Sequence, residues 1–333
     1  MLKKILIIGL GGSGQRHLRI IRKFNKKIKI AIFREKKKTP LINKKFKPIY
    51  NCSIEKRFTC ENLTKKEILK KKFQMIIIAN PTSLHLTKCL RFKNNTDFFF
   101  VEKPFSNQFD KSINFIKKNI KQKYFLTVHQ KIFDPTWNLY KKEYFSKSNI
   151  KRIYFKTHSD VRKWHPYENY KNLYACRKNL GGGVILTECH EIRYAFDLLG
   201  MPISVFCHPN KKVDNLDVET SAIIIMNYKK IQVIIELNMM SIKVERSCEI
   251  ISNTNVIFID FNKKSITAIN EDKEKKFKLK FSNDYNFEQQ WKYAKNVFEK
   301  NKIKEANLNT LAMIKLLKNI NESKYKKKEI YIK

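Results

Sequence analysis

The first part of the chain alternates short apolar runs with segments of helical spacing. The apolar runs are rich in Ile and Phe and too short for helices, so they predict buried strands. These strands are expected at residues 5–8, 28–33, 73–79, 97–101 and 124–129, with a further short strand near 48–49. Helices are expected after residue 14, over 61–72, from 84 onward, and up to residue 121. The repeated strand–helix order predicts a doubly wound parallel sheet over residues 1–128.

Residues 129–333 follow a different pattern, which predicts a second, α+β domain. A strand is expected at 150–157, an irregular aromatic and basic stretch at 160–183, and one helix over 184–199. Alternating strands then predict an open, mostly antiparallel sheet. They occupy residues 204–208, 219–227, 231–238, 243–251 and 256–261. Helices at 285–298 and 308–323 complete the domain and can pack back on the first one.

The first strand runs directly into Gly9-Leu10-Gly11-Gly12-Ser13-Gly14, and helical spacing follows. Strand, glycine turn and helix form the context in which a G-x-G-x-x-G match predicts dinucleotide binding. Gly9 is expected to allow the tight turn, Gly11 to admit a pyrophosphate, and Gly14 to let helix and strand pack closely. The start of the helix, at Gly12 and Ser13, then offers free N–H groups to the phosphates.

The end of the second strand bears on which dinucleotide is bound. A carboxylate is expected there in proteins that prefer NAD, but this strand ends in Phe33-Arg34-Glu35. A guanidinium at Arg34 can hold a 2′-phosphate with two hydrogen bonds, which favours NADP over NAD. Alternatively, Glu35 binds the ribose and Arg34 stacks on the adenine.

Charge and cysteine content add limits to this interpretation. The 333 residues carry 70 Lys and Arg against 30 Asp and Glu, a formal net charge of +40. The lysines are spread along the chain without a recognisable nucleic-acid-binding module, so a coding bias toward AT-rich codons explains them, and no specific nucleic acid is expected. A polyanion-binding role driven by charge remains a third, weaker hypothesis.

The seven cysteines form no C-x-x-C pair and indicate reduced thiols in a cytoplasmic protein, with neither disulfides nor a metal site. No apolar run approaches the ~20 residues that cross a bilayer, so no membrane insertion is expected.

Several further motifs resemble those of one known family. They are Asn80-Pro81-Thr82 with His85, Glu102-Lys103-Pro104, and Gly181-Gly182-Gly183 followed by His190. Tyr174-Ala175-Cys176-Arg177-Lys178 and Asn321-Glu322-Ser323 are similar to the family as well. Together with the glycine turn at Gly9, they resemble the Gfo/Idh/MocA oxidoreductases over nearly the whole chain. These enzymes join a dinucleotide-binding domain to an open-sheet domain.

The resemblance implies hydride transfer between NADP, or NAD, and a carbinol or carbonyl carbon of a sugar or nucleotide sugar, in surface-glycan biosynthesis. It implies Lys103 and His190 as the catalytic residues, with a depressed pKa allowing Lys103 to exchange protons. The residues it implies for cofactor binding, besides the glycine turn and Arg34, are Asn80, Pro81, Thr82, His85 and Glu102. Those implied for substrate binding are Lys103, Trp164, Tyr174, Arg177, Thr187 and His190. By the same analogy, subunits are expected to pair as a homodimer or homotetramer.

The sequence departs from the family pattern close to His190. Relatives tend to carry Asp three residues before and three after this histidine, where this chain has Thr187 and Arg193, and an Arg where it has Ile132. Glu188 and Glu191 project at other angles from a continuous helix, so neither is expected to replace the missing acids. These departures either change the substrate or indicate the alternative function, a non-catalytic dinucleotide-binding sensor or co-regulator.

Overall fold

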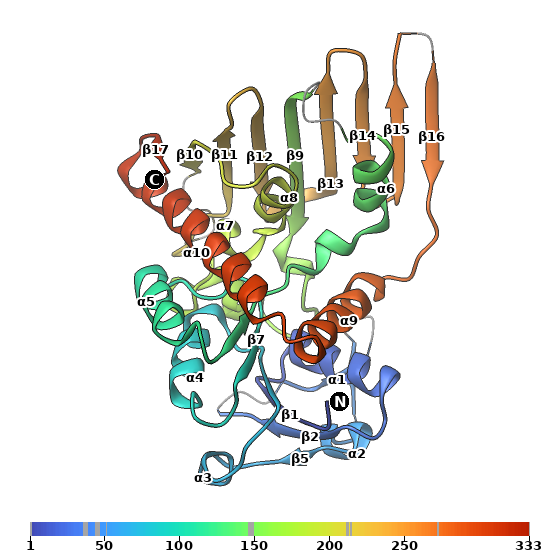
Figure 1. Ribbon diagram of the computed structural model, residues 1–333. Coiled ribbons are helices and arrows are strands. Elements are labelled where there is room, and N and C mark those ends of the chain that lie inside the picture. The colour runs from blue at the N-terminus through green and yellow to red at the C-terminus, as the bar shows by residue number, and fades with distance from the viewer. Residues whose placement is uncertain are drawn as a thin grey trace.

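The computed structural model describes residues 2–35, 39–43, 47–50, 52–145, 150–210, 213, 215–271 and 273–332. Its described part contains two large sheets, drawn one above the other in Figure 1. The lower sheet belongs to the first part of the chain and the upper one to the second. The fold class expected from the sequence, an α/β domain with a second, mostly antiparallel domain, is confirmed.

The first sheet has six parallel strands in the order β5-β2-β1-β6-β7-β8, which is the doubly wound arrangement. Its strands are β1 (Lys4–Ile8), β2 (Lys29–Phe33), β5 (Glu61–Asn62), β6 (Met75–Ile78), β7 (Phe98–Val101) and β8 (Tyr124–Leu126). Its helices are α1 (Gly12–Phe24), α2 (Ile54–Phe58), α3 (Lys65–Leu69), α4 (His85–Arg91) and α5 (Phe109–Asn119), with the 3₁₀ turn η1 (Thr82–Leu84). Every residue of β6 and β7 is buried, because helices cover both faces of the sheet.

Two expectations for residues 39–72 are confirmed in part. The strand expected near residue 48 is present as β4 (Pro48–Ile49), but among the described residues it pairs with β3 (Leu41–Ile42) in a separate two-stranded ladder and not with the parallel sheet. The edge of the parallel sheet is instead β5, at the start of the segment expected to be helical. The two residues of β5 are polar and exposed, so no apolar pattern marks them. The helix begins later, where Thr64 and Glu67 form a reciprocal capping box.

Among the described residues, the second sheet has nine strands in the order β16-β15-β14-β13-β9-β12-β11-β10-β17, and its one parallel pair is β9 with β12. Its strands are β9 (Ile150–Asp160), β10 (Ser204–Pro209), β11 (Ser221–Asn227), β12 (Gln232–Asn238), β13 (Met240–Ser252), β14 (Val256–Asp260), β15 (Ser265–Ile269), β16 (Glu274–Lys278) and β17 (Ile330–Tyr331). The last three strands lie beyond the pattern found in the sequence. β16 is exposed along its whole length, so it has no buried face to detect.

Helices of the second part cover one face of this sheet and reach back to the first sheet (Figure 1). They are α6 (Pro135–Glu143), α7 (Val184–Thr187), α8 (His190–Leu199), α9 (Tyr285–Glu299) and α10 (Ile303–Lys326). Helix α10 contacts β10 at one end and β8 and α5 at the other, and Trp291 of α9 joins the core beneath β1. The 3₁₀ turns are η2 (Gln130–Phe133), η3 (Val161–Lys163), η4 (Tyr170–Asn172), η5 (Tyr174–Cys176) and η6 (Lys178–Leu180). A domain boundary between residues 128 and 129 stays a prediction.

The helix expected over residues 184–199 is two helices. Helix α7 ends at Glu188, whose φ and ψ are −105° and 39°, and α8 starts again after Cys189. The break changes the direction in which residues 188–193 project. The argument that Glu188 projects away from the site assumed one continuous helix and therefore does not hold.

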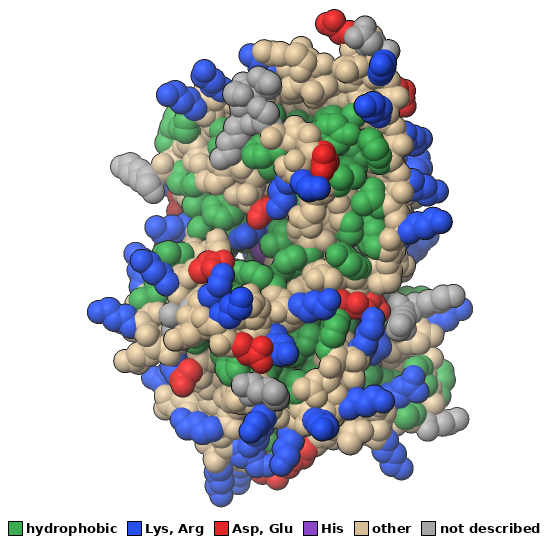
Figure 2. Space-filling view, turned by 45° about the vertical axis from the view of Figure 1, so that its right-hand side comes forward, with side chains coloured by type: hydrophobic (Ala, Val, Ile, Leu, Met, Phe, Trp, Pro, Cys, Tyr) green, Lys and Arg blue, Asp and Glu red, His purple; other side chains and the backbone are tan. Residues whose placement is uncertain are grey.

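Two surface features complete the description. Lys and Arg side chains are scattered over the face shown in Figure 2 and do not gather in one patch. Within the described residues, no helix is long and apolar enough to cross a membrane.

Candidate active site

The glycine turn lies where β1 meets α1, at the carboxyl edge of the parallel sheet. Gly9 has a φ of +87°, and a Cβ there would lie 2.8 Å from the backbone of Ala79 and Asn80. A Cβ on Gly14 would lie 2.0 Å from the carbonyl oxygen of Gly9. Both glycines are therefore required by close backbone approaches.

Gly11 has no such neighbour, since a Cβ there would meet nothing within 4 Å. It precedes α1, and no side chain caps the first turn of that helix, which contains Gly12 and Ser13. Open space beside uncapped N–H groups is the surface that a pyrophosphate needs. The residues present thus fit a dinucleotide cofactor.

The turn Asn80-Pro81-Thr82 follows β6, the neighbour of β1, and packs against Gly9. His85 fixes this turn from α4, with Nε2 2.7 Å from the Asn80 carbonyl oxygen and Nδ1 3.0 Å from that of Pro104. Burial lowers the pKa of His85, although the two carbonyl groups favour the protonated ring. The Asn80 side-chain oxygen is buried and has no hydrogen-bond partner among the described residues, so it is available to a ligand.

Arg34 and Glu35 follow β2 and have different partners. The guanidinium of Arg34 donates from Nη2 to the Thr39 carbonyl oxygen at 2.9 Å, and its buried Nε has no partner in the described chain. The carboxylate of Glu35 pairs with Lys88 and, at 2.7 Å, with Arg91. Hydrogen bonding to Lys88 lowers the pKa of Glu35. Helix α4 therefore already binds the carboxylate that would otherwise be free to accept from a ribose.

Glu102 follows β7 and is bound within the protein. Its Oε1 lies 2.7 Å from Nε2 of His17 on α1, and both side chains are buried. Burial raises the pKa of Glu102, but hydrogen bonding and the charge of His17 outweigh it and lower the pKa overall. This contact ties α1 to the strand end that carries the next residue, Lys103.

Lys103 crosses from the first sheet to the second part of the chain. Its peptide bond to Pro104 is cis, and its Nζ donates a hydrogen bond of 2.5 Å to the Thr187 carbonyl oxygen at the end of α7. Burial alone would lower its pKa, but Tyr174, Cys189 and the carboxylates of Glu188 and Glu102 raise it overall. The depressed pKa expected for Lys103 is therefore wrong, and this group stays protonated at neutral pH.

His190 opens α8 and is 4% exposed. Its Nε2 faces the side-chain amide of Gln130 at 3.5 Å, and its Nδ1 has no hydrogen-bond partner among the described residues. The ring packs edge-on against His129, with 5.8 Å between centroids. Burial and then the charges of Lys103 and Arg246 hold the pKa of His190 well below its usual range. The site thus places a neutral imidazole in the electrostatic field of an ammonium group.

The Gly181-Gly182-Gly183 turn connects the two parts of the chain. A Cβ on Gly181, whose φ is +76°, would lie 2.9 Å from Cβ of Thr82 in the cofactor turn. A Cβ on Gly182 would lie 2.3 Å from the Tyr174 carbonyl oxygen. Only glycine fits at these contacts, which bring α7 up to the end of β6.

The remaining residues expected to bind substrate separate into two groups. Tyr174 and Thr187 lie beside Lys103, and the buried Thr187 hydroxyl has no partner in the described structure. Trp164 is half-buried against the core, and Arg177 is exposed. Among the described residues, no hydrogen bond or ion pair joins either of them to Lys103 or His190.

Arg193, the residue that stands in place of a family acid, is buried on α8. Its guanidinium lies 5.2 Å from the Phe196 ring centroid, and burial lowers its pKa while Asp197 opposes that change. Its charge also contributes to the lowered pKa of His129. The position is therefore occupied by a cation close to the site.

The structure adds a buried group of charges that the sequence did not reveal. Arg246 of β13 pairs with Glu188 and, at 3.2 Å, with Glu191, whose side chain is 0% exposed. Lys131 of η2 lies near them, and burial, followed by the charge of Arg246, lowers its pKa to about 8. Because these residues come from segments far apart in sequence, no local spacing marks them. The described residues contain no cluster of side chains suited to a metal ion.

Comparison with known proteins agrees with this geometry. Residues 3–130 match the family model of the Gfo/Idh/MocA oxidoreductases, described as an oxidoreductase family with an NAD-binding Rossmann fold. The match covers the dinucleotide-binding part of the chain, so this part is similar to the family. A search of curated proteins finds no match.

Solved structures resemble the whole chain at low sequence identity. WlbA dehydrogenase from Bordetella pertussis, in complex with NADH and UDP-GlcNAcA, has a TM-score of 0.76 and 14% identity, covering 100% of this chain and 99% of its own. Levoglucosan dehydrogenase with NADH and L-sorbose has a TM-score of 0.78 and 13% identity, covering 99% of both chains. UDP-N-acetylglucosamine 3-dehydrogenase GnnA from Acidithiobacillus ferrooxidans has a TM-score of 0.73 and 12% identity, covering 97% of this chain and 98% of its own. These likenesses establish the shared fold.

Proposed function

We propose that this protein is an oxidoreductase that uses NADP, or NAD, to transfer hydride to or from a carbinol or carbonyl carbon of a sugar or nucleotide sugar. The observation that carries the proposal is the pairing of a charged Lys103 with a neutral His190 at the carboxyl edge of the dinucleotide-binding sheet. Hydride transfer at a carbinol needs such a pair, because the hydroxyl loses a proton as the carbon loses hydride.

Each residue has a defined part in this reaction. When bound, the nicotinamide accepts the hydride in oxidation and returns it in reduction. The Lys103 ammonium group stabilises negative charge on the substrate oxygen, and His190 accepts the hydroxyl proton. The glycine turn and the uncapped start of α1 would hold the diphosphate, and the unpartnered Asn80 side-chain oxygen would be available to the cofactor.

The proton-accepting atom follows from the surroundings of His190. Gln130 Oε1 and His190 Nδ1 are both buried without partners, and the amide faces Nε2 at 3.5 Å. The amide orientation that presents Oε1 to Nε2–H gives both of these atoms a hydrogen-bond partner. Nδ1 then keeps its lone pair and serves as the base.

The proposed substrate class rests on the fold and on the relatives named above. WlbA was solved with UDP-GlcNAcA, GnnA is named a UDP-N-acetylglucosamine 3-dehydrogenase, and levoglucosan dehydrogenase was solved with L-sorbose. Surface-glycan biosynthesis in the cytoplasm is the corresponding setting, and Trp164, Tyr174, Arg177 and Thr187 are proposed substrate contacts. A homodimer or homotetramer formed through the open face of the nine-stranded sheet is proposed by the same analogy.

The proposed preference for NADP rests on Arg34. Its neighbour Glu35 is bound by Lys88 and Arg91, which leaves the guanidinium as the group placed to meet a 2′-phosphate. The relatives crystallised with NADH favour NAD instead. Direct comparison of the two cofactors decides between these alternatives.

The experiment that tests the function is reduction of added cofactor. The purified protein is mixed with NADP or NAD and a panel of sugars and nucleotide sugars, and absorbance of the reduced nicotinamide is followed. Turnover is expected in the wild type and is expected to fall by about 10²–10⁴-fold in Lys103→Ala and in His190→Ala. Turnover that survives both substitutions would refute the proposed roles.

A second candidate function, a non-catalytic dinucleotide-binding sensor, is favoured by Thr187 and Arg193, which replace two acids of the family pattern. It is distinguished by tight cofactor binding without turnover on any member of the panel. In that case Arg193→Asp is the variant expected to restore activity.

A further inference from the structure

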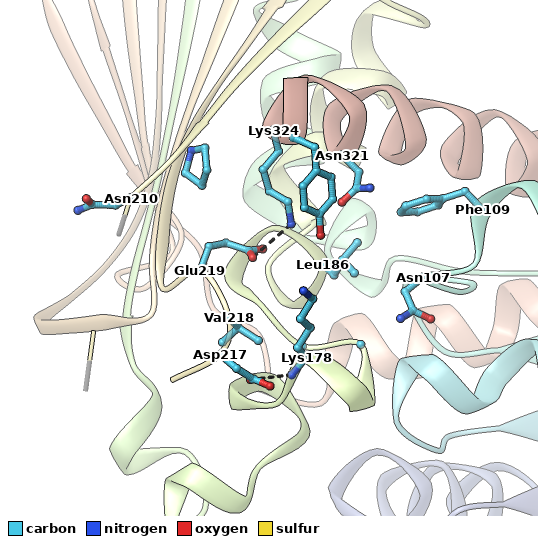
Figure 3. Close-up of a pocket in the computed structure, with 14 residues that line it drawn as sticks. Asn107, Phe109, Lys178, Leu186, Asn210, Asp217, Val218, Glu219, Asn321 and Lys324 are labelled. Carbon is cyan, nitrogen blue, oxygen red and sulfur yellow. Dashed lines mark hydrogen bonds and ion pairs between the residues drawn. The ribbon is translucent and has the colours of Figure 1, made fainter. Parts of the chain in front are cut away.

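A cavity of about 770 Å³ opens beside Gly181 and Gly182, between the start of α5 and the end of α10. Figure 3 shows side chains from both parts of the chain pointing into it. Neither Lys103 nor His190 lines it. Its size falls in the range of small-molecule sites, about 300–1,000 Å³. We propose that this groove is a second binding site, one that takes a sugar.

The charges in the groove exclude a simple polyanion site. Two ammonium groups and two carboxylates line it, although the whole chain carries +40. The Lys324 Nζ lies 3.4 Å from Glu219 Oε2, and Asp217 accepts a hydrogen bond of 2.9 Å from the Lys178 backbone N–H. Positive and negative side-chain charges therefore balance in the groove.

The polar groups of the groove supply both donors and acceptors. Asn107, Asn321 and Glu219 face the same space from the loop before α5, from α10 and from the loop before β11. The Asn321 side chain and the Lys178 ammonium group have no hydrogen bond or ion pair within the described residues. Sugar hydroxyls donate and accept at once, so a mixture of amides, carboxylates and ammonium groups matches them.

The apolar part of the lining completes the match. Phe109 lies at one end of the groove, Leu186 lies along its wall, and Tyr325 stands beside Asn321 with 62% of its surface exposed. Aromatic faces bury the C–H face of a sugar ring, while the ring edge keeps its hydroxyls for the polar groups. A planar apolar ligand would leave the amides and charges unpaired, which disfavours it.

The groove and the candidate active site are lined by different residues, although they meet at α7. Leu186 lines the groove, and the next residue, Thr187, accepts the hydrogen bond from Lys103, which is absent from the groove lining. Gly181 also lines the groove while contacting Thr82 of the cofactor turn. A sugar bound here is a second molecule, separate from the sugar carbon that would react beside Lys103.

The test measures binding without cofactor, so its outcome does not depend on whether the protein turns over substrate. Glucose, N-acetylglucosamine and glucuronic acid are titrated onto the full chain, and saturation-transfer difference NMR reports contact and affinity. At least one of the three is expected to bind saturably. The double variant Asn321→Leu, Tyr325→Ala is expected to weaken that binding at least tenfold.

Two controls make the result specific. Tyr331→Ala removes an equally exposed tyrosine, 67% exposed, outside the groove, and Lys103→Met alters the candidate active site; both are expected to keep the affinity. Thermal unfolding confirms that each variant is folded. The proposal is overturned if none of the three sugars binds saturably, if the groove variant binds as the wild type does, or if Lys103→Met abolishes binding.

Discussion

The side-chain nitrogen of Lys103 donates a hydrogen bond of 2.5 Å to the carbonyl oxygen of Thr187, 84 positions further along the chain. This contact joins the end of β7 in the parallel sheet to the end of α7, one turn before His190. It uses the backbone at a position where family members tend to carry an aspartate side chain. The ammonium group therefore keeps a partner although the acid is absent.

The protonation states of Lys103 and His190 predict the pH profile of the reaction. The pKa of Lys103 is raised and that of His190 is held well below its usual range, so neither group titrates between about pH 7 and 9. The value of kcat/KM for oxidation is expected to stay level over this interval. A change of kcat/KM with a midpoint near pH 8 would contradict this expectation and would point to Lys131, whose pKa is about 8. The variant Lys131→Met would then remove that pH dependence.

Gly11 and Gly14 of the glycine turn are expected to respond differently to the same added methyl group. Gly14→Ala places a Cβ 2.0 Å from the Gly9 carbonyl oxygen, so the backbone must move, at a cost of about 1–3 kcal/mol in the free energy of unfolding. Gly11→Ala adds its methyl group to open space, so stability is expected to be unchanged. Because that space is where the pyrophosphate would lie, its cofactor Kd is expected to rise at least about tenfold, or 1.4 kcal/mol. Chemical denaturation and a cofactor titration measure both effects; equal stabilities for the two variants would refute the packing argument.

Arg34 is expected to discriminate between the two nicotinamide cofactors. Arg34→Leu removes the guanidinium that would meet a 2′-phosphate, and charge-assisted hydrogen bonds of this kind contribute about 1.5–3 kcal/mol. The Kd for NADPH should therefore rise by about tenfold to a hundredfold while the Kd for NADH changes little. Arg152→Leu removes an exposed arginine of β9 and serves as the matched control for net charge. An equal loss of affinity for NADH and NADPH would instead support the alternative in which Arg34 stacks on the adenine and Glu35 binds the ribose.

Arg246 is expected to be essential for stability because it neutralises two acids behind His190. Glu191 is 0% exposed and the Glu188 side chain only 12% exposed, so Arg246→Met leaves uncompensated charge in the interior. Breaking a buried pair in this way costs about 3–5 kcal/mol. The control Lys263→Met breaks a contact of 3.5 Å to Asp260 from a lysine that is 80% exposed, and should change stability by less than about 1 kcal/mol. Similar denaturation midpoints for the two variants would show that the buried charges are not coupled.

Much of the fold could be predicted because many of its strands are recognisable from their own apolar residues. β1, β6 and β7 are uninterrupted apolar runs, as expected for strands covered on both faces, and the glycine turn follows β1 directly. The expected doubly wound sheet and the open second sheet are both confirmed. By contrast, β5 and β16 are exposed and polar, so their strand pairing comes only from backbone hydrogen bonds with a neighbour. The prediction of one continuous helix over residues 184–199 was wrong for a similar reason. The helix is interrupted at Glu188, whose side chain pairs with Arg246 from a distant strand, and local spacing does not reveal that contact.

The same distinction between local sequence and tertiary contacts applies to the candidate site. The sequence by itself determined the residue types and their places at strand ends, including the glycine turn, Lys103 and the histidine after the three glycines. Only the tertiary structure decided what those side chains meet: the Thr187 carbonyl for Lys103, His17 for Glu102, and Lys88 with Arg91 for Glu35. It also decided their charge, because a pKa depends on burial and on the charges of neighbours brought together from distant segments. Local spacing encodes strands and turns, whereas the state of a buried ionisable group is a property of the assembled fold.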